Sequence, residues 1–511
     1  MIPARPEAPP RTPLRALADL AAAGGTATGG AGDTVVTGLT MNSRAVRPGD
    51  LYVAPAGATT HGARFAADAV GSGAVAVLTD PAGAELCQEA AVGVPVLVVP
   101  APRSVVGDLA ARVYGDPATG LRLLGVTGTQ GKTTTTRLAE GALQAQGVPA
   151  AVIGTVGTRI DGEDVASALT TPEAPELHAL FAVMRERGVE ACAMEVSSHA
   201  LVMGRVDGVV FGVAAFTNLG RDHLDFHADV EDYFRAKARL FTPERARLGL
   251  VNVDDEHGRR LAAEAEVPVR TFSPSGADAD WRATDVSATA SGSVFTLLGP
   301  GVRERVEVPI PGDFNVANAV CAVAGLAELG YDVAAVAAGM ARVPGVPGRL
   351  EPVDAGQDFL AVVDYAHKPD AVAAVLRSLR ARTGGRLLVV IGAGGDRDRG
   401  KRPLMGEVAA RLADVVVVTD DNPRTEDPAA VRAEVLAGTR GGPAEVHEVG
   451  DRGAAIRFAV SLAQEGDCLV VAGKGHETGQ EVAGTVHPFD DRIELSEALG
   501  ALVTHPGRTT A

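Results

Sequence analysis

Short apolar runs separated by glycine-rich turns dominate the first hundred residues. Between residues 14 and 102 such runs recur, for example in GDLYVAPAG at 49–57 and GAVAVLTD at 73–80. Apolar segments of this length, bounded by turn residues, are typical of buried strands. The pattern therefore predicts a small α/β domain in this part of the chain.

Further along, apolar runs alternate with longer helix-like stretches, at 175–187 and 230–241 among others. Strands that alternate with helices form mostly parallel sheets with helices on both faces. Strands of a central region are expected at 149–155, 190–198, 209–219 and 248–255. A later set is expected at 359–365, 386–395, 414–421, 444–450 and 467–475, each but the last followed by a helix-like stretch.

Two breaks divide this pattern into three parts. DPATGL at 116–121 is typical of a linker, and RVPGVPGRLE at 342–351 carries two proline–glycine breaks. We therefore expect an α/β protein of three domains, at 14–115, 116–344 and 345–511. The last is expected to be doubly wound, with ligand-binding loops at the carboxyl ends of its strands.

Composition narrows the class of protein. The chain has 511 residues, 46% of them hydrophobic, and a net charge of -17, which argues against nucleic-acid binding. No apolar run approaches the roughly 18 residues of a membrane span, so a cytoplasmic protein is expected. The scattered cysteines Cys87, Cys192, Cys321 and Cys468 lack metal-ligand spacing and are expected to be buried free thiols.

The most informative segment is LRLLGVTGTQGKTTTT at 121–136, an apolar strand followed by a glycine-rich turn and a helix start. Such a loop lets backbone N–H groups approach phosphate oxygens, while Lys132 adds a positive charge and Thr133 can bind Mg²⁺ through its hydroxyl. Val126 stands where the general Walker pattern has its first glycine. We predict that the central domain is a P-loop ATPase domain and that ATP is bound by Thr127, Gly128, Thr129, Gln130, Gly131, Lys132 and Thr133.

Two polar groups follow strands of the same domain. Glu195 lies at the end of a predicted strand, where its carboxylate can hold Mg²⁺ together with the Thr133 hydroxyl; the serines after it could equally cap a helix. His223 and His227 are four residues apart, but Leu224 stands where the zinc-protease pattern HExxH needs glutamate. His223 is therefore interpreted as a metal ligand or phosphate contact.

Lys237 belongs to the helical stripe that contains Tyr233, Leu240 and Phe241, and is expected to face inward. A lysine whose stem is buried and whose amine reaches water explains such a position. A neutral amine could instead react with CO₂ to form a carbamate that binds a second Mg²⁺. The spacing alone favours the first interpretation.

Loops of the third domain carry further polar groups. GAGGDRDRGKRP is basic and suits a carboxylate or a phosphate, and in DDNPR the proline fixes a turn beside the planar fork of Arg424. GKGHE at 473–477 adds a lysine, a histidine and a glutamate at the same edge of the sheet.

The chain resembles the Mur ligases of peptidoglycan synthesis. The resemblance is carried, in family order, by GVTGTQGKTTT, TTPEAPEL, EVSSHAL, TNLGRDHLDFH, YFRAKARLF, GDFNVANA, PGRLE, DYAHKPDA, GAGGDRDRGKRP, DNPR and GKGHE, between about residues 39 and 494. It implies an N-terminal domain for the UDP-sugar, a central ATPase domain and a Rossmann-like C-terminal domain that closes over the site. It also implies a monomeric ligase that uses ATP and Mg²⁺ to add meso-diaminopimelate to UDP-N-acetylmuramoyl-L-alanyl-D-glutamate through an acyl phosphate.

The resemblance also implies roles for individual residues. Lys132, Glu195, His223 and Lys237 would be catalytic, and Thr133, Glu195, His223 and carbamylated Lys237 would hold two Mg²⁺ ions. Asn315, Arg349 and His367 would join the ATP site, and Ser43, Thr170, Thr171, Ser197 and Arg205 would bind the UDP-sugar dipeptide. Diaminopimelate would be held by Arg397, Asp421, Asn422, Pro423, Arg424, Gly473 and Glu477. Asn42 and Met203 depart from the usual Asp and Gln of the family.

Alternatives remain open from the residues. A folylpolyglutamate synthetase would share the ATPase loop but needs neither DNPR nor the first domain. A regulatory ATP-binding protein would have no need of a second metal site, and lysine is the competing amino acid, disfavoured by Arg424. The 342–351 linker is the expected hinge for domain closure.

Overall fold

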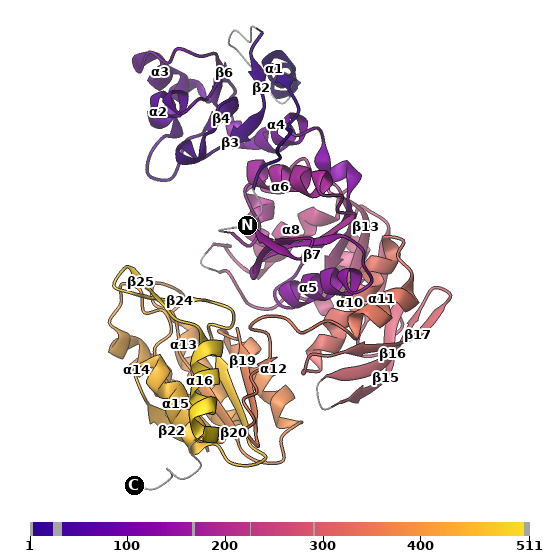
Figure 1. The fold of residues 1–511 in the computed structure, drawn as a ribbon, viewed down its shortest axis with the longest axis vertical. Coiled ribbons are helices and arrows are strands. Elements are labelled where there is room, and N and C mark those ends of the chain that lie inside the picture. The colour runs from indigo at the N-terminus through magenta and orange to yellow at the C-terminus, as the bar shows by residue number, and fades with distance from the viewer. Residues whose placement is uncertain (1–3, 24–32, 166–168, 225, 290–291, 505–511) are drawn as a thin grey trace.

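The protein is described here from a computed structural model, which describes residues 4–23, 33–165, 169–224, 226–289 and 292–504. Three large sheets follow one another along the described part of the chain, and the elongated molecule carries the first at one end and the third at the other (Figure 1). The predicted boundaries at 115/116 and 344/345 fall between these sheets; we propose them as the domain boundaries. None of the helices in the described ranges combines the length and apolar character that crossing a bilayer requires.

The first domain is α/β, as predicted, and has a four-stranded parallel sheet. The order is β3 (Gly38–Thr40), β4 (Asp50–Ala54), β5 (Ala76–Thr79) and β6 (Val96–Val98). A short ladder of β1 (Thr12–Pro13) and β2 (Val35–Val36) precedes it. Its α-helices are α1 (Leu14–Ala23), α2 (Ala66–Gly71), α3 (Pro81–Glu89) and α4 (Val106–Val113).

The central domain has an 11-stranded sheet whose middle is parallel. Strand β7 lies between β11 and β12, so the loops that leave these three strands meet at one edge of the sheet. The strands, in spatial order, are β10 (Glu163–Val165), β9 (Gly157–Ile160), β8 (Ala150–Gly154), β11 (Ala191–Glu195), β7 (Arg122–Thr127), β12 (Phe211–Phe216), β13 (Ala246–Asn252), β14 (Val269–Ser273), β15 (Trp281–Ala288), β16 (Ser293–Gly299) and β17 (Val302–Val308).

Helices cover both faces of this sheet, as predicted. One apolar core lies under α5 (Lys132–Gln144), α10 (Phe314–Glu328) and α11 (Val333–Met340). The other lies under α6 (Ala174–Glu186), α7 (Ser198–Val202), α8 (Val230–Ala238) and α9 (Glu256–Glu264). The antiparallel additions β9–β10 and β15–β17 at the two edges were not predicted.

The third domain has a six-stranded sheet in the order β18 (Glu351–Pro352), β19 (Leu360–Asp364), β23 (Cys468–Ala472), β20 (Leu387–Ile391), β21 (Val415–Val418) and β22 (Glu445–Glu448). All neighbours are parallel except β18 and β19, so the doubly wound prediction is confirmed. Helices α12 (Pro369–Arg380), α13 (Lys401–Leu412) and α14 (Pro428–Thr439) cover one face, and α15 (Arg452–Leu462) and α16 (Asp491–Thr504) the other. A hairpin of β24 (Gly479–Val482) and β25 (Thr485–Pro488) follows β23.

Short 3₁₀ turns complete the described elements: η1 (Ser43–Ala45), η2 (Gly62–Phe65), η3 (Pro102–Ser104), η4 (Pro117–Gly120) and η5 (Arg239–Phe241). The last of these continues α8, so the predicted helix at 230–241 changes its winding near its end. All four cysteines are buried free thiols, as expected.

Candidate active site

The glycine-rich loop leaves β7 and ends where α5 begins at Lys132. Gly128 and Gly131 have positive φ angles of 144° and 88°, which side-chain-bearing residues rarely adopt. The neighbouring strand end supports the loop, because the Thr217 hydroxyl donates to the Gln130 carbonyl at 2.6 Å and the Asn218 side chain accepts from the Gln130 N–H at 2.9 Å. Contacts from the residues after β12 therefore hold the loop in shape.

Two lysine amines converge on the carbonyl of Gly128. Nζ of Lys132 and Nζ of Lys237 each donate to it at 2.8 Å, although the two residues come from different helices. Burial lowers the pKa of Lys132 to about 8, against the opposing effect of the Glu195 charge. Burial and the nearby Lys132 charge lower the pKa of Lys237 well below its ordinary value. This side chain is 1% exposed, so the prediction that it faces inward is confirmed.

Glu195 ends β11, directly beside the loop of β7, and is 1% exposed. Both carboxylate oxygens are held by Thr155, the residue after β8: its N–H donates to Oε1 at 2.8 Å and its hydroxyl to Oε2 at 3.1 Å. The carboxylate thus has a fixed orientation at the carboxyl ends of neighbouring strands, where ligands of such sheets bind.

His223 lies in the loop after β12 with a positive φ of 52°. Burial, together with the Lys368 and Lys132 charges, lowers the pKa of its imidazole to about 4, although Asp222 beside it acts in the opposite direction. A neutral imidazole can accept a hydrogen bond or bind a metal ion. His227, by contrast, is buried and bonded to Ser198 and Asp232, at 3.0 and 3.1 Å, which leaves both ring nitrogens occupied.

The residues expected to bind the sugar dipeptide form two groups. Thr170, Thr171, Ser197 and Arg205 gather next to Glu195: the Thr171 hydroxyl donates to the Glu195 carbonyl at 2.9 Å, and Arg205 pairs with Glu173 at 2.9 Å. Ser43 is separate, in η1 of the first domain. A substrate that reached both groups would have to span two domains.

The residues expected near ATP come from three elements. Asn315 is buried near the start of α10, where its amide donates to Pro311 and its oxygen accepts from Asn318 at 2.8 Å. Arg349, in the interdomain linker, donates to the Thr133 hydroxyl at 3.1 Å and lies over the Tyr365 ring. The His367 ring resists protonation, because burial and the Lys368 and Lys401 charges lower its pKa to about 3.

A second polar cluster lies in the third domain, at the ends of β21 and β23. The buried amine of Lys474 donates to Asn422 at 2.9 Å and to Glu477 at 3.1 Å, and the Asn422 amide donates to Glu477 at 2.9 Å. Asp421 approaches Gly473 closely enough that a side chain at that glycine would not fit. Although burial opposes it, the Arg452 and Lys474 charges hold the pKa of Asp421 below its ordinary value.

Arg424 follows Pro423 in a left-handed conformation, with φ of 54°. Its guanidinium donates to the Gly395 carbonyl at 2.6 Å, and its backbone pairs with Glu481 and Ala483 of the hairpin region. Arg397 is exposed on the preceding loop. The residues predicted to bind diaminopimelate, other than Arg397, therefore lie together around one hairpin.

The donor set fits Mg²⁺. In the described ranges, no three histidine, cysteine, aspartate or glutamate side chains are grouped as a metal cage. Magnesium usually binds through one or two carboxylates together with water and substrate phosphates. The buried Glu195 carboxylate and the Thr133 hydroxyl beside the phosphate loop are ligands of this kind. The Lys237 amine can bind a metal ion only after conversion to a carbamate.

Contacts across the domains were missed from the sequence. Lys368 of the third domain forms an ion pair with Asp222 of the central domain, and the His476 ring faces the backbone of Thr155. Lys474 was noted only as a lysine at the sheet edge. In the sequence, these contacts were marked only by charged residues next to two histidines: Lys474 two positions before His476, and Asp222 directly before His223.

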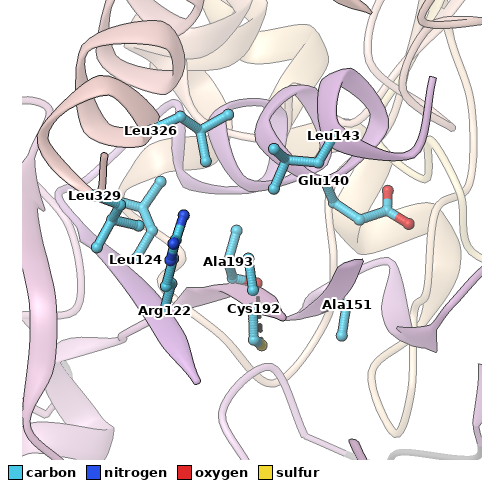
Figure 2. Close-up of a pocket in the computed structure, with 10 residues that line it drawn as sticks. Arg122, Leu124, Glu140, Leu143, Ala151, Cys192, Ala193, Leu326 and Leu329 are labelled. Atoms are coloured by element: carbon cyan, nitrogen blue, oxygen red, sulfur yellow. Dashed lines mark hydrogen bonds between the residues drawn. The ribbon is translucent and has the colours of Figure 1, made fainter. Parts of the chain in front are cut away.

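A pocket in the central domain has no part in this site. It is lined by Leu124, Leu143, Leu326 and Leu329 with the buried Glu140, and Arg122, the first residue of β7, lies at its edge (Figure 2). The phosphate loop leaves the opposite end of the same strand. Its apolar lining and position identify the pocket as a packing gap between α5, α10 and the sheet.

The three sheets and the phosphate loop are those of a multidomain protein with a nucleotide-binding central domain, and comparison with known proteins identifies its family. The Mur ligase family catalytic domain matches residues 35–114, the Mur ligase middle domain 126–326, and the Mur ligase glutamate ligase domain 348–475. The chain belongs to the Mur ligase family.

Two curated relatives are similar over almost their whole length. The UDP-N-acetylmuramoyl-L-alanyl-D-glutamate–2,6-diaminopimelate ligase of Streptomyces avermitilis is 57% identical, over 97% of this chain and 98% of that protein. The protein of the same name from Corynebacterium glutamicum is 52% identical, over 92% of each chain.

Solved structures show the same fold. A 2,6-diaminopimelate ligase structure covers 92% of this chain and 96% of its own, with a TM-score of 0.65 and 35% identity. The structure of a UDP-N-acetylmuramoylalanyl-D-glutamyl-2,6-diaminopimelate–D-alanyl-D-alanyl ligase from Acinetobacter baumannii is 19% identical and covers 91% of this chain and 96% of its own, with a TM-score of 0.64. The latter likeness concerns the fold alone.

Proposed function

We propose that this chain is the ligase that adds meso-diaminopimelate to UDP-N-acetylmuramoyl-L-alanyl-D-glutamate, with ATP converted to ADP and phosphate. The names of the relatives that are 57% and 52% identical support this activity. We further propose that the enzyme uses Mg²⁺ and works as a monomer in the cytoplasm.

The reaction must join an anionic carboxylate to the anionic γ-phosphoryl group of ATP before the amide bond can form. A carboxylate is a poor acylating agent, so the D-glutamate side-chain carboxylate takes the γ-phosphoryl group of ATP and becomes an acyl phosphate. The diaminopimelate amine then attacks the acyl carbon, phosphate leaves, the amine loses a proton, and an amide bond forms. An anion attacks an anion in the first step, and positive charge offsets that repulsion.

Residues of this chain supply part of that charge. The P-loop N–H groups and Lys132 would hold the phosphates, and Arg349 would approach them from the linker, since it already contacts Thr133 at 3.1 Å. Thr133, Glu195, His223 and carbamylated Lys237 would hold Mg²⁺, which when bound offsets phosphate charge and orients the phosphoryl group.

The substrates would be distributed over the domains. Ser43 would contact the uridine nucleotide, and Thr170, Thr171, Ser197 and Arg205 would hold the dipeptide beside Glu195. Asn315 and His367 would lie near adenine or ribose. Diaminopimelate would lie at Arg397, Asp421, Asn422, Pro423, Arg424, Gly473 and Glu477, with Arg424 gripping a carboxylate.

One observation carries the proposal most strongly. Arg349 of the interdomain linker and Lys368 of the third domain contact Thr133 and Asp222 on the phosphate-loop side. In this proposal the amino-acid site and the nucleotide site, on different domains, would face each other, as a reaction between two separately bound substrates requires.

The direct test measures phosphate release and product mass with ATP, Mg²⁺ and the UDP-sugar dipeptide. We expect turnover with meso-diaminopimelate and a product heavier than the dipeptide substrate by one diaminopimelate residue. Turnover only with glutamate and a folate acceptor would instead establish the folylpolyglutamate alternative.

A further inference from the structure

Thr155 touches three parts of the site at once. It follows β8, where its N–H and hydroxyl hold the two oxygens of Glu195 at 2.8 and 3.1 Å. Its hydroxyl also lies 3.2 Å from the Thr170 hydroxyl. Because the Thr155 hydroxyl gives its proton to Glu195, its lone pair is left to accept from Thr170.

The loop around Thr155 is itself fixed. Arg137, on the helix that begins at the phosphate loop, donates to the Val156 and Gly157 carbonyls at 2.8 and 3.2 Å. Any side chain at Gly154 would collide with Oε1 of Glu195, because the end of β8 packs directly against this carboxylate. Movement of the helix that follows the phosphate loop would therefore displace the loop that contains Thr155.

The third domain reaches the same residue. The ring of His476, which packs 5.0 Å from the Tyr365 ring, faces a backbone group of Thr155. Thr155 thus lies between the carboxylate of the central domain, a threonine expected to touch the sugar dipeptide, and the domain expected to close over the site.

We propose that Thr155 is a positioning residue that orients Glu195 for the divalent cation and links this orientation to Thr170. The proposal rests on the proposed function, since Glu195 is the carboxylate assigned there to Mg²⁺. Residues that hydrogen-bond a metal ligand fix its orientation, and their loss typically weakens metal binding about 10- to 100-fold.

The test measures Mn²⁺ binding by electron paramagnetic resonance in the presence of ADP, where no ligation occurs. Thr155→Val keeps the N–H bond to Oε1 and removes the hydroxyl, and with it both the bond to Oε2 and the contact with the Thr170 hydroxyl. We expect its Mn²⁺ dissociation constant to rise about tenfold, and Thr155→Ser, which restores the hydroxyl, to bind within about twofold of the wild type.

Thr158→Val is the matched control. Thr158 is three residues further on, is buried, and its hydroxyl has no hydrogen-bond partner among the described residues, so this variant should bind Mn²⁺ as the wild type does. Wild-type-like Mn²⁺ binding by Thr155→Val, or failure of Thr155→Ser to restore binding, would overturn the proposal. Wild-type ligation, assayed on the same preparation, tests the proposed function separately.

The same variants separate positioning of the metal ligand from a role in substrate binding. In the ligation assay, Thr155→Val should raise the Mg²⁺ concentration for half-maximal rate about tenfold while leaving the KM for diaminopimelate nearly unchanged. A loss of rate that no Mg²⁺ concentration relieves, with normal Mn²⁺ binding, would assign Thr155 to the substrate instead.

Discussion

At the scale of single residues, the site depends on groups whose charge state is set by burial. The Lys237 amine is 1% exposed, donates to the Gly128 carbonyl, and has a pKa lowered well below its ordinary value. A neutral amine is the form that reacts with CO₂, losing a proton to give a carbamate. The structure thus strengthens the carbamate interpretation over that of a lysine whose amine reaches water.

Lys237→Ala is expected to lower kcat at least about 100-fold, because it removes the group assigned to the second metal and opens a buried site beside the loop. Ligation assays and intact-protein thermal melting measure the effect. Arg239→Ala, on the exposed side of the same segment, is the control and should change little. Near-normal turnover of Lys237→Ala would refute the metal-ligand role.

Arg424→Lys is expected to raise the KM for diaminopimelate at least about tenfold, since lysine lacks the planar fork for a carboxylate. It also loses the 2.6 Å bond from the guanidinium to the Gly395 carbonyl. The KM for the UDP-sugar dipeptide should stay within about twofold, because that substrate is assigned to other domains. Equal losses for both substrates would contradict the local role.

His178 predicts part of the dependence of stability on pH. It is buried in α6, donates to the Asp207 carbonyl at 3.0 Å, and burial lowers its pKa to about 4 from 6.5. The unfolded chain therefore binds this proton more readily, so stability is lost as pH falls from about 6.5 towards 4, by up to about 3 kcal/mol. In urea unfolding at pH 7.5 and 5, His178→Gln should lose less stability than the wild type, and equal losses would contradict this.

At the scale of elements, the end of β8 must stay free of side chains. A Cβ at Gly154 would collide with the Glu195 carboxylate, so Gly154→Ala should displace that group and lower kcat about tenfold or more. Gly93→Ala, where an added Cβ meets open space, is the control. Unchanged kcat and Mg²⁺ dependence in Gly154→Ala would contradict the assigned place of Glu195.

The regular elements were predictable because each combined an apolar run with clear turn signals. The strand before the phosphate loop and the five parallel strands of the third domain are examples. The antiparallel strands β15–β17 were missed, because the end of β15 extends beyond the core and is exposed, so its apolar pattern fades. The alternation in VRERVEV of β17 was the available signal.

The site was predictable in its parts rather than in its connections. Lys237 facing inward follows from helical spacing, and Glu195 from its place after a strand. Thr155 could not be found that way, since a lone threonine after a strand is unremarkable until the fold brings it to Glu195. The Lys368–Asp222 pair joins residues 146 apart in the chain, which no local pattern reveals.

At the scale of the whole molecule, the central and third domains contact each other at several places. Besides the Lys368–Asp222 pair, Arg382 donates to the Thr289 and Gly292 carbonyls at 2.9 and 3.0 Å. These contacts hold the two domains at separate points, one beside the site and one at the antiparallel extension of the central sheet.

Breaking the pair beside the site should favour an open form. Lys368→Ala and Asp222→Asn are each expected to lower kcat/KM about tenfold, and the double variant should lose less than the product of the two, because both remove one interaction. Small-angle scattering should show a larger radius of gyration for each. Fully multiplicative losses with unchanged dimensions would show that the pair does not govern closure.

The most direct test of the central claim is amino-acid-dependent ligation by the purified protein. With ATP, Mg²⁺ and UDP-N-acetylmuramoyl-L-alanyl-D-glutamate, we expect phosphate release and a tripeptide product with meso-diaminopimelate and almost none with L-lysine. Turnover with lysine would retain the ligase but contradict the role of Arg424. Silence with both amino acids would contradict the proposed function itself.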